Sequence, residues 1–582
     1  MAGKIWRERE AGYAGNITEN PPRGEDFYFS RLSAIIEVMM RGILSEEIKK
    51  ALKALYPDIS CSEISVSRNA NFSFGDYGFA SFSLASGIGR NPKEIAEKIK
   101  EKLLASKKIN KYVSKIEVAG SGFLNFWLSE EGVKDGLDFL NKKKFAFGKN
   151  KKIQIEFISA NPTGELHIGN GRSAFYGDSL SNILKLAGYD IEREYYVNDA
   201  KASAQIKELG KTVLGQGTSY LTDYLKSKIS AFGGKGKDEG EAGYLLAGEI
   251  QKDNQRFIEK DLGVKFDKWF SEEKELHQKK TIEKTLELLK KKGLFYEKEE
   301  AFWLKTSQYG DDEDRVIVRS DGAPSYFLTD IAYHIDKFRR GFQIIIDIWG
   351  ADHQGHEKRM YAAKKALGWK GDLKILITQM VTFKEEGEKK KLSKRKGDLV
   401  LLKDLLKEVG LDAMRWFFLE KALSTHMEFD MQLAKERSKK NPVYYVQYAH
   451  ARACSILKKA GIRSPSPKFF VMSRPAKAGL DLTLPAHQSK NFGPARYERN
   501  LILKFIQFPE IIEDIVKDYQ IHRLTTYVYE LAKVFTDFYE NAPVLKAETE
   551  ELKKSRLILV LITRKILEKS LSLMGIFAPQ RM

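Results

Sequence analysis

A strand-to-helix junction at residues 153–188 constrains the fold of this chain more than any other stretch. The short apolar run 153–158 has the length and composition of a buried strand, and a turn-rich loop follows it. A helical pattern then begins near His167 and ends at Gly188. Where a parallel-sheet strand leads into a helix, the helix N-terminus offers a site for anionic ligands. The junction therefore predicts a doubly wound parallel sheet with an anion-binding edge.

Three further segments have the same character as this first strand. Residues 191–197, 343–349 and 373–379 are short and apolar, and most of them precede a helical pattern. This alternation is typical of a parallel sheet with helices on both faces. Residues 205–300 are highly charged and helical in pattern, so they predict an insertion that interrupts the alternation.

The two ends of the chain differ from this middle part, and 582 residues exceed what a single core usually holds. The N-terminal part combines alternating segments with an amphipathic helix at Pro92–Leu104, which predicts a small α+β domain. After residue 438 only helical patterns remain, which predicts an all-α domain. We therefore expect a multidomain α/β protein. Its expected parts are a tail of unknown role at 1–38, the α+β domain at 39–148, the doubly wound domain at 149–437 and the helical domain at 438–582.

The formal net charge is +19, and it is unevenly distributed. Residues 438–582 hold 24 Lys and Arg against 13 Asp and Glu, a surplus of 11 positive charges in a quarter of the chain. A basic surplus of this kind favours a polyanionic partner such as nucleic acid. A basic cytosolic enzyme without such a partner remains an alternative.

Cysteine usage and hydropathy indicate the compartment. Cys61 and Cys454 are the only two cysteines, and they form no C-x-x-C pair, so neither a disulfide framework nor a cysteine zinc site is supported. No apolar run reaches the roughly 18 residues of a membrane helix. The N-terminus has no apolar signal region, and Met39 or Met40 would serve as an alternative start. These features predict a cytoplasmic protein that does not enter a membrane.

Two motifs carry the expected chemistry. In His167-Ile-Gly169-Asn170, the glycine allows a nucleotide to approach the backbone, and the histidine can donate to phosphate oxygens. The alternative is a histidine whose hydrogen bonds are satisfied within a loop. The second motif, around Lys391, Ser393 and Lys394, supplies ammonium groups that can neutralise phosphates. Its alternative is a solvated basic loop.

Together, the two motifs resemble the signature pair of class I aminoacyl-tRNA synthetases, and residues 41–582 resemble arginyl-tRNA synthetases. The resemblance implies a Rossmann-like catalytic domain, with ATP, arginine and tRNA as substrates and Mg²⁺ accompanying ATP. It implies arginyl-adenylate formation, dependent on bound tRNA, and transfer of arginine to the terminal adenosine. Asn170 departs from the family, where histidine is usual. A monomer is expected.

The resemblance also implies the residues that hold arginine. Tyr326 and Asp330 match the family pair that binds the guanidinium, and four-residue spacing places them on one helical face. Glu156 and Asn161 would hold the amino and carboxylate end, and His353 would be a further pocket residue. The turn 197–200 would line the pocket, and zinc binding by Asp352, His353 and His356 remains open.

A final group of residues points to RNA. Tyr445, Tyr448 and Arg452 lie one helical turn apart, and such side chains can stack on unpaired bases. The alternative is an aromatic stripe in the core. The resemblance implies a helical anticodon-binding domain here and an N-terminal domain that touches the outer corner of the tRNA. The rival functions are another class I synthetase, an RNA-binding protein without catalysis, and a small nucleotidylyltransferase.

Overall fold

The structure is a computed structural model that divides into two units, Met1–Phe139 and Leu140–Met582. Three predicted site residues, Lys391, Ser393 and Lys394, lie outside the described residues, as does the tail 1–38. The structure describes residues 39–59, 64–69, 71–142, 147–148, 150–384, 400–462 and 494–582.

The first unit packs helices on a four-stranded antiparallel sheet of order β1-β2-β4-β3. Helix α5 (Pro92–Leu104) has the predicted bounds, and Asn91 caps it by accepting a hydrogen bond from the Lys93 N–H at 2.9 Å. Its apolar face, with Ile95 and Ile99, is buried in contact with β3 and β4. The remaining elements are α3 (Met40–Leu55), β1 (Val66–Arg68), β2 (Tyr77–Ala80), α4 (Phe82–Ile88), α6 (Lys107–Tyr112), β3 (Val113–Ala119), β4 (Phe123–Leu128) and α7 (Glu130–Lys142).

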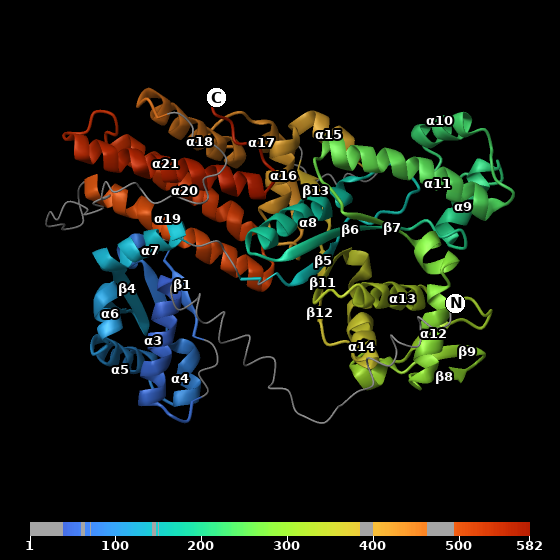
Figure 1. The fold of residues 1–582 in the computed structure, drawn as a ribbon, viewed down its shortest axis with the longest axis horizontal. Coiled ribbons are helices and arrows are strands. Elements are labelled where there is room, and N and C mark those ends of the chain that lie inside the picture. Colours follow the sequence, from blue (N-terminus) through green and yellow to red (C-terminus); the bar gives the residue numbers. More distant parts are fainter. Residues whose placement is uncertain are drawn as a thin grey trace, which may run out of the picture. The chain divides into compact units, whose positions relative to one another are not determined.

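The second unit is built on a five-stranded parallel sheet of order β12-β11-β5-β6-β7, which confirms the predicted doubly wound fold (Figure 1). Four of its strands match the predicted segments. The fifth, β7, was assigned to the helical insertion, and that part of the prediction is wrong. Its four residues are too few for a periodic pattern to show. The strands are β5 (Lys152–Glu156), β6 (Asp190–Val197), β7 (Lys268–Ser271), β11 (Ile344–Gly350) and β12 (Asp372–Thr378).

Helix α8 (Ile168–Leu186) connects β5 to β6 and is buried along most of its length. It contacts both neighbouring strands of the sheet and also helices α16, α19 and α21 of the C-terminal part. Its packing is close, because a Cβ atom at Gly177 would lie 2.2 Å from the Phe157 ring. The helix that begins at the first motif therefore also packs against the predicted RNA-binding part.

The remainder of the insertion is largely helical, as predicted. Helices α9, α10 and α11 share a small apolar core of their own. A separate antiparallel sheet of order β10-β9-β8 precedes α13. The bounds are α9 (Ala204–Val213), α10 (Asp223–Phe232), α11 (Glu239–Arg256), η2 (Phe257–Asp261), η3 (Glu273–Gln278), α12 (Thr281–Lys291), β8 (Phe295–Lys298), β9 (Ala301–Leu304), β10 (Arg315–Val318), α13 (Tyr326–Arg339) and α14 (Glu357–Leu367).

Beyond residue 438 the described residues form helices only, as the sequence predicts. Asn441 caps α18 by accepting a hydrogen bond from the Val443 N–H at 3.2 Å. No helix in the described ranges has the length and apolarity that crossing a bilayer would require. The bounds are β13 (Val381–Lys384), α15 (Leu402–Val409), α16 (Leu411–Leu419), β14 (Met427–Asp430), α17 (Met431–Lys435), α18 (Pro442–Lys459), α19 (Pro494–Asp518), α20 (His522–Asn541) and α21 (Glu550–Leu573).

Candidate active site

The carboxyl ends of β5, β6 and β11 lie together at the point where the strand order of the sheet reverses. The chain runs from β5 through α8 to β6 on one side, while β11 pairs with β5 on the other. Ligands of doubly wound sheets bind in the crevice at such a point. Glu156 ends β5, and Val197 ends β6. We refer to this place as the sheet edge.

The turn that follows β5 is strained. Ile158 and Ser159 have φ angles of 71° and 41°, which are rare for residues other than glycine and most unfavourable for a β-branched one. The Ser159 N–H donates to the Phe157 carbonyl at 3.1 Å, which closes a three-residue turn around Ile158. The Tyr195 hydroxyl accepts from the Ala160 N–H and donates to its carbonyl, at 3.1 and 3.2 Å. Such strain persists where surrounding contacts fix the chain, and it is common at functional sites.

Ser159 joins several parts of the edge. Its hydroxyl donates to Glu156 at 2.9 Å and accepts from the Tyr196 N–H at 3.1 Å. Its carbonyl accepts from the Asn198 amide at 2.9 Å. Asp199 accepts from the Ser271 hydroxyl at 2.6 Å. The predicted turn 197–200 is therefore at the edge, but its polar side chains are engaged in fixing neighbouring segments.

His167 is the N-cap of α8. Its Nδ1 accepts from the Gly169 N–H at 3.1 Å, so a neutral ring carries its proton on Nε2. Burial lowers the pKa of His167, which keeps the ring neutral at pH 7. The Asn170 side chain accepts from the His167 N–H at 3.0 Å and completes a capping box. This capping role of Asn170 was not foreseen from the sequence, which placed the residue in the first motif without a role of its own.

Residues 400–402 follow the lysine motif in the sequence and lie beside the start of α8, next to His167. The Ile168 N–H donates to the Val400 carbonyl at 3.0 Å, and the Leu402 N–H donates to the Leu166 carbonyl at 2.9 Å. His167 and Leu401 form an antiparallel bridge. Residues 400–402, which follow the lysine motif in the sequence, are thus paired with the start of α8.

Tyr326 and Asp330 lie on successive turns of α13, as predicted. Tyr326 is 61% exposed, and Ser325 caps the helix through the Leu328 N–H at 3.3 Å. Protein atoms surround Asp330, which retains only part of its surface open to solvent. Within the described residues its carboxylate has no hydrogen bond or ion pair. Burial, with Glu272 and Glu156 nearby, raises the pKa of Asp330 to about 7.

Glu272 is a residue that the sequence did not single out. It follows β7 and is 9% exposed. It raises the pKa of Asp330, and together with burial it also raises the pKa of Tyr196. A second carboxylate therefore lies close enough to Asp330 to oppose its ionisation. In the sequence, Glu272 is marked only by its place directly after a short aromatic strand. Several other acids lie close by, so this position alone does not distinguish it.

The other predicted arginine ligands differ in how far they are buried. Glu156 is buried and accepts from Lys337 Nζ at 2.7 Å, while Asn161 is exposed in the same post-β5 loop. His353 lies in η5 (Ala351–His356), exposed, with its ring centre 6.1 Å from that of Trp349. Among the described residues no three His, Cys, Asp or Glu side chains are grouped to hold a metal. The zinc alternative for Asp352, His353 and His356 therefore gains no support from the described residues.

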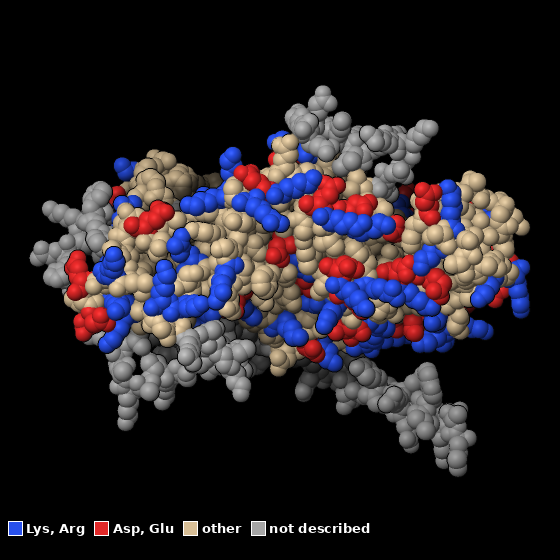
Figure 2. Space-filling model, turned by 90° about the horizontal axis from the view of Figure 1, so that it is seen from above, with Lys and Arg blue, Asp and Glu red and all other residues tan. Residues whose placement is uncertain are grey.

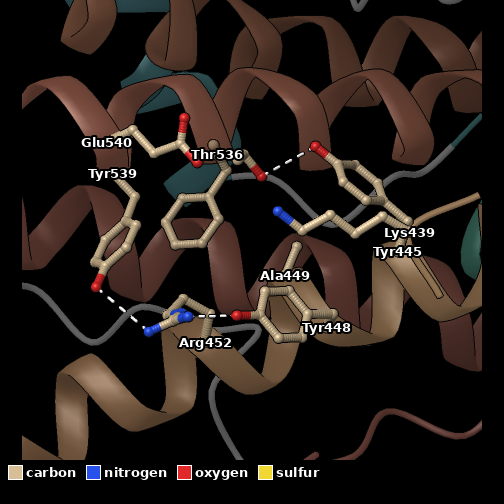
Figure 3. A pocket seen from close by; sticks show the side chains of 9 residues that line it. Lys439, Tyr445, Tyr448, Ala449, Arg452, Thr536, Tyr539 and Glu540 are labelled. Carbon is tan, nitrogen blue, oxygen red and sulfur yellow. Dashed lines mark hydrogen bonds between the residues drawn. The ribbon is translucent and has the colours of Figure 1, made fainter.

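Tyr445, Tyr448 and Arg452 line a pocket between α18 and α20 (Figure 3). The Arg452 guanidinium lies over the Tyr448 and Tyr539 rings, at 5.3 and 5.1 Å from their centres, and it donates to both hydroxyls. The Tyr445 hydroxyl donates to Thr536 at 3.1 Å. All three predicted residues are partly exposed, so they are not simply a core stripe. The other residues of the pocket are Lys439, Ala449, Phe535, Thr536, Tyr539 and Glu540.

Charge is mixed on the outer surface. Figure 2 shows rows of Lys and Arg side chains with Asp and Glu between them on one face. The basic surplus is therefore not gathered into one uniform patch on this face. An aromatic pocket adds a different kind of contact to this distributed charge.

Family models match three successive stretches of the chain. They are the arginyl tRNA synthetase N terminal domain over residues 42–128, the class I (R) tRNA synthetase catalytic domain over 136–204 and 238–438, and the DALR anticodon binding domain over 446–582.

Relatives agree with these matches. Arginine–tRNA ligase 1 of Halalkalibacterium halodurans is 39% identical over 578 residues, covering 93% of this chain and 99% of the relative. The Listeria monocytogenes arginine–tRNA ligase is 39% identical over 540 residues, covering 87% and 92%.

Solved structures agree as well. A putative arginyl-tRNA synthetase from Campylobacter jejuni matches with a TM-score of 0.65 and 31% identity over 77% of this chain and 98% of its own. The Thermus thermophilus arginyl-tRNA synthetase, at 22% identity, shares the fold over 94% of this chain and 100% of its own, with a TM-score of 0.70. With residues 400–402 paired to the start of α8 and an acid without an ion pair on α13, the chain belongs to the arginyl-tRNA synthetases, the class I enzymes that charge tRNA with arginine.

Proposed function

We propose that arginine lies along the sheet edge between α13 and β5. Its guanidinium contacts Asp330 and Tyr326, with Glu272 as a second acidic neighbour. Its ammonium faces Glu156 and Asn161, and His353 borders the pocket. The observation that supports this placement best is the Asp330 carboxylate, which is surrounded by protein and forms no ion pair within the described residues. A guanidinium supplies the missing charge and two parallel N–H donors.

Adenylation follows from this placement. A carboxylate oxygen of arginine attacks the α-phosphorus of ATP, and the bond to pyrophosphate breaks. The neutral His167 donates its Nε2 proton as a hydrogen bond to phosphate oxygens, where charge develops in the transition state. Gly169 leaves room beside the ring for the nucleotide, and Asn170 holds the start of α8. Mg²⁺ is expected to arrive with ATP, held by phosphate oxygens and water.

Lys391 and Lys394 neutralise the departing pyrophosphate in this proposal, with Ser393 between them in the motif. The six residues from Lys394 to Val400 span at most about 20 Å. Because Val400 bonds to Ile168, this length allows the lysine side chain to reach a triphosphate at His167.

The tRNA then accepts the arginyl group. The hydroxyl of its terminal adenosine attacks the adenylate carbonyl, so no protein nucleophile is required. We assign anticodon-side binding to residues 438–582, with Tyr445, Tyr448 and Arg452 as base contacts, and outer-corner binding to residues 39–148. A monomeric state, a cytoplasmic location and the role of 1–38 stay predictions.

Exchange of labelled pyrophosphate into ATP tests the arrangement. The assay is run with each amino acid in turn, with and without tRNA. We expect exchange with arginine only, and only when tRNA is bound. Lys394→Ala should lower the exchange rate far more than it weakens arginine binding, because the ammonium acts on charge that develops in the transition state. Equal losses of rate and affinity would contradict the phosphate role, and exchange without tRNA would contradict the coupling.

A further inference from the structure

Lys337 is a fully buried lysine on the same face of α13 as Asp330 and Tyr326. Its side chain has no exposed surface, although it belongs to the last turn of a helix, where lysines usually extend into water. Positions 326, 330 and 337 are four and seven residues apart, so one stripe of the helix carries all three. The helix that presents the guanidinium ligands thus also inserts a positive charge beneath the edge.

Two carboxylates and an aromatic ring surround the Lys337 ammonium. Lys337 Nζ donates to Glu156 Oε2 at 2.7 Å and to Asp347 Oδ1 at 2.6 Å. It also lies 4.1 Å from the centre of the Tyr333 ring. Because this ammonium has no exposed surface and donates to both acids, it is closed to direct contact with a substrate. Lys337 can therefore act on a ligand only through a neighbour.

The two carboxylates that share Lys337 are not equally supplied with positive charge. Asp347 also accepts from His334 Nε2 at 2.9 Å, whereas the second partner of Glu156 is the Ser159 hydroxyl. Burial opposes ionisation of Asp347, but Lys337 and His334 hold its pKa below the ordinary value. Burial raises the pKa of Glu156 against the opposing effect of Lys337. Glu156 thus has Lys337 as its only cationic partner among the described residues, and it shares that partner with Asp347.

We propose that Lys337 is a positioning residue for the amino-acid substrate, because it fixes the Glu156 carboxylate at the end of β5 as the receptor for the substrate ammonium. The inference rests on the proposed role of Glu156 and adds the residue that makes this role possible. Lys337 joins α13 to β5 and β11, so it also sets the place of Glu156 relative to Asp330. An arginine that spans the two acids then meets both at fixed positions.

A ligand without the ammonium separates this role from a general structural one. Full-length enzyme is titrated by calorimetry with L-arginine and with 5-guanidinopentanoic acid, which is arginine without its α-amino group. The wild-type enzyme should prefer arginine. In Lys337→Met this preference should fall by at least about tenfold, because Glu156 loses its orientation. Binding of the desamino compound should change much less. Equal weakening of both ligands would overturn the proposal.

Glu156→Gln distinguishes failure of this inference from failure of the proposed function. If both single variants lose the preference, and the double variant loses no more than either, Lys337 acts through Glu156. If Glu156→Gln loses the preference and Lys337→Met keeps it, the inference is wrong and the Glu156 assignment stands. If Glu156→Gln keeps the preference, both are wrong.

Removal of a buried lysine can prevent folding, so a charge-matched variant accompanies it. Lys337→Gln with Asp347→Asn removes one positive and one negative charge and retains hydrogen-bonding groups. This variant should fold and still lose at least about tenfold of the preference for arginine; if it keeps the preference, the proposal fails. Lys504→Met is the matched control. Lys504, on α19, is also buried and pairs with Glu530 at 2.6 Å. Its loss should lower the melting temperature without altering the preference for arginine over the desamino compound.

Discussion

The sheet edge and the α18–α20 pocket are built on opposite principles. At the edge, Glu156 and Asp330 are carboxylates surrounded by protein, and Asp330 has no partner in the described residues. In the pocket, Arg452 is partly exposed and already bonded to two tyrosine hydroxyls. One region is left incomplete until a charged ligand enters. The other is complete by itself and offers stacking surfaces.

This difference teaches how each region discriminates. An unmatched charge in a low-dielectric setting makes binding strongly dependent on ligand charge and on pH. A partly exposed aromatic and guanidinium surface depends on stacking area, and phosphate contacts near it depend on salt. Small charged substrates suit the first arrangement, and a large flexible polyanion suits the second.

The largest effect is expected from Asp330→Asn. Arginine affinity should fall by about 2–5 kcal/mol, because the guanidinium loses its buried anionic partner. ATP affinity should change little. The melting temperature at pH 8 should not fall, since the variant removes an unpaired charge. Calorimetric titration and thermal unfolding measure these quantities. A drop in melting temperature with unchanged arginine affinity would give Asp330 a structural role and remove the contrast between the regions.

Arg452→Met tests the pocket. Affinity for tRNA should fall by about 1–3 kcal/mol, as expected for loss of a stacking platform. The melting temperature should stay nearly constant because the side chain is partly exposed. Filter binding at several salt concentrations measures the affinity. The control is Arg523→Met, which removes an arginine that pairs with Asp518 at the start of α20. Equal effects of both variants on tRNA would reduce the pocket to general surface charge.

The pH dependence of arginine binding sharpens the contrast. The pKa of Asp330 is about 7 in the free enzyme, and a bound guanidinium favours the ionised form. Affinity should therefore rise with pH up to about 7 and level off above it. Between pH 8 and pH 6 the loss should be roughly tenfold, or about 1.4 kcal/mol. Asp330→Asn should give a flat profile in the same titration; a variant profile as steep as the wild type would assign the proton to another group.

The smallest effect is expected from Asn170→Ala. The free energy of unfolding should fall by about 1 kcal/mol, because the cap of α8 loses its bond to the His167 N–H. The adenylation rate should fall only modestly. Denaturant unfolding and pyrophosphate exchange report the two effects. Asn182→Ala, farther along α8, is the control for the rate. A large loss of rate at unchanged stability would instead give Asn170 a direct role in the reaction.

Local patterns predicted much of the fold and part of the site. The four apolar strands, the capped helix at Pro92–Leu104 and the helical C-terminal part follow from periodicity and capping residues. The positions of His167 at a helix start and of Tyr326 with Asp330 on one helix face follow from the same rules. Short-range geometry decides all of these features, so the sequence alone contains them.

Other features depend on contacts that sequence distance conceals. Strand β7 is only four residues long, and it carries Glu272 to the edge because parallel pairing with β6 aligns their carboxyl ends. Lys337 looks like an ordinary lysine near a helix end until two buried acids from β5 and β11 meet at its ammonium.

The sequence by itself determined most of the helices and strands, and it predicted which residues hold the phosphate and guanidinium groups of the substrates. The tertiary structure decided which charges are buried, which acid forms no ion pair within the described residues, and which side chains are engaged in holding others. The physical reason is that propensity, capping and periodicity act over a few residues. Burial and electrostatic pairing depend instead on groups that only the folded sheet brings together.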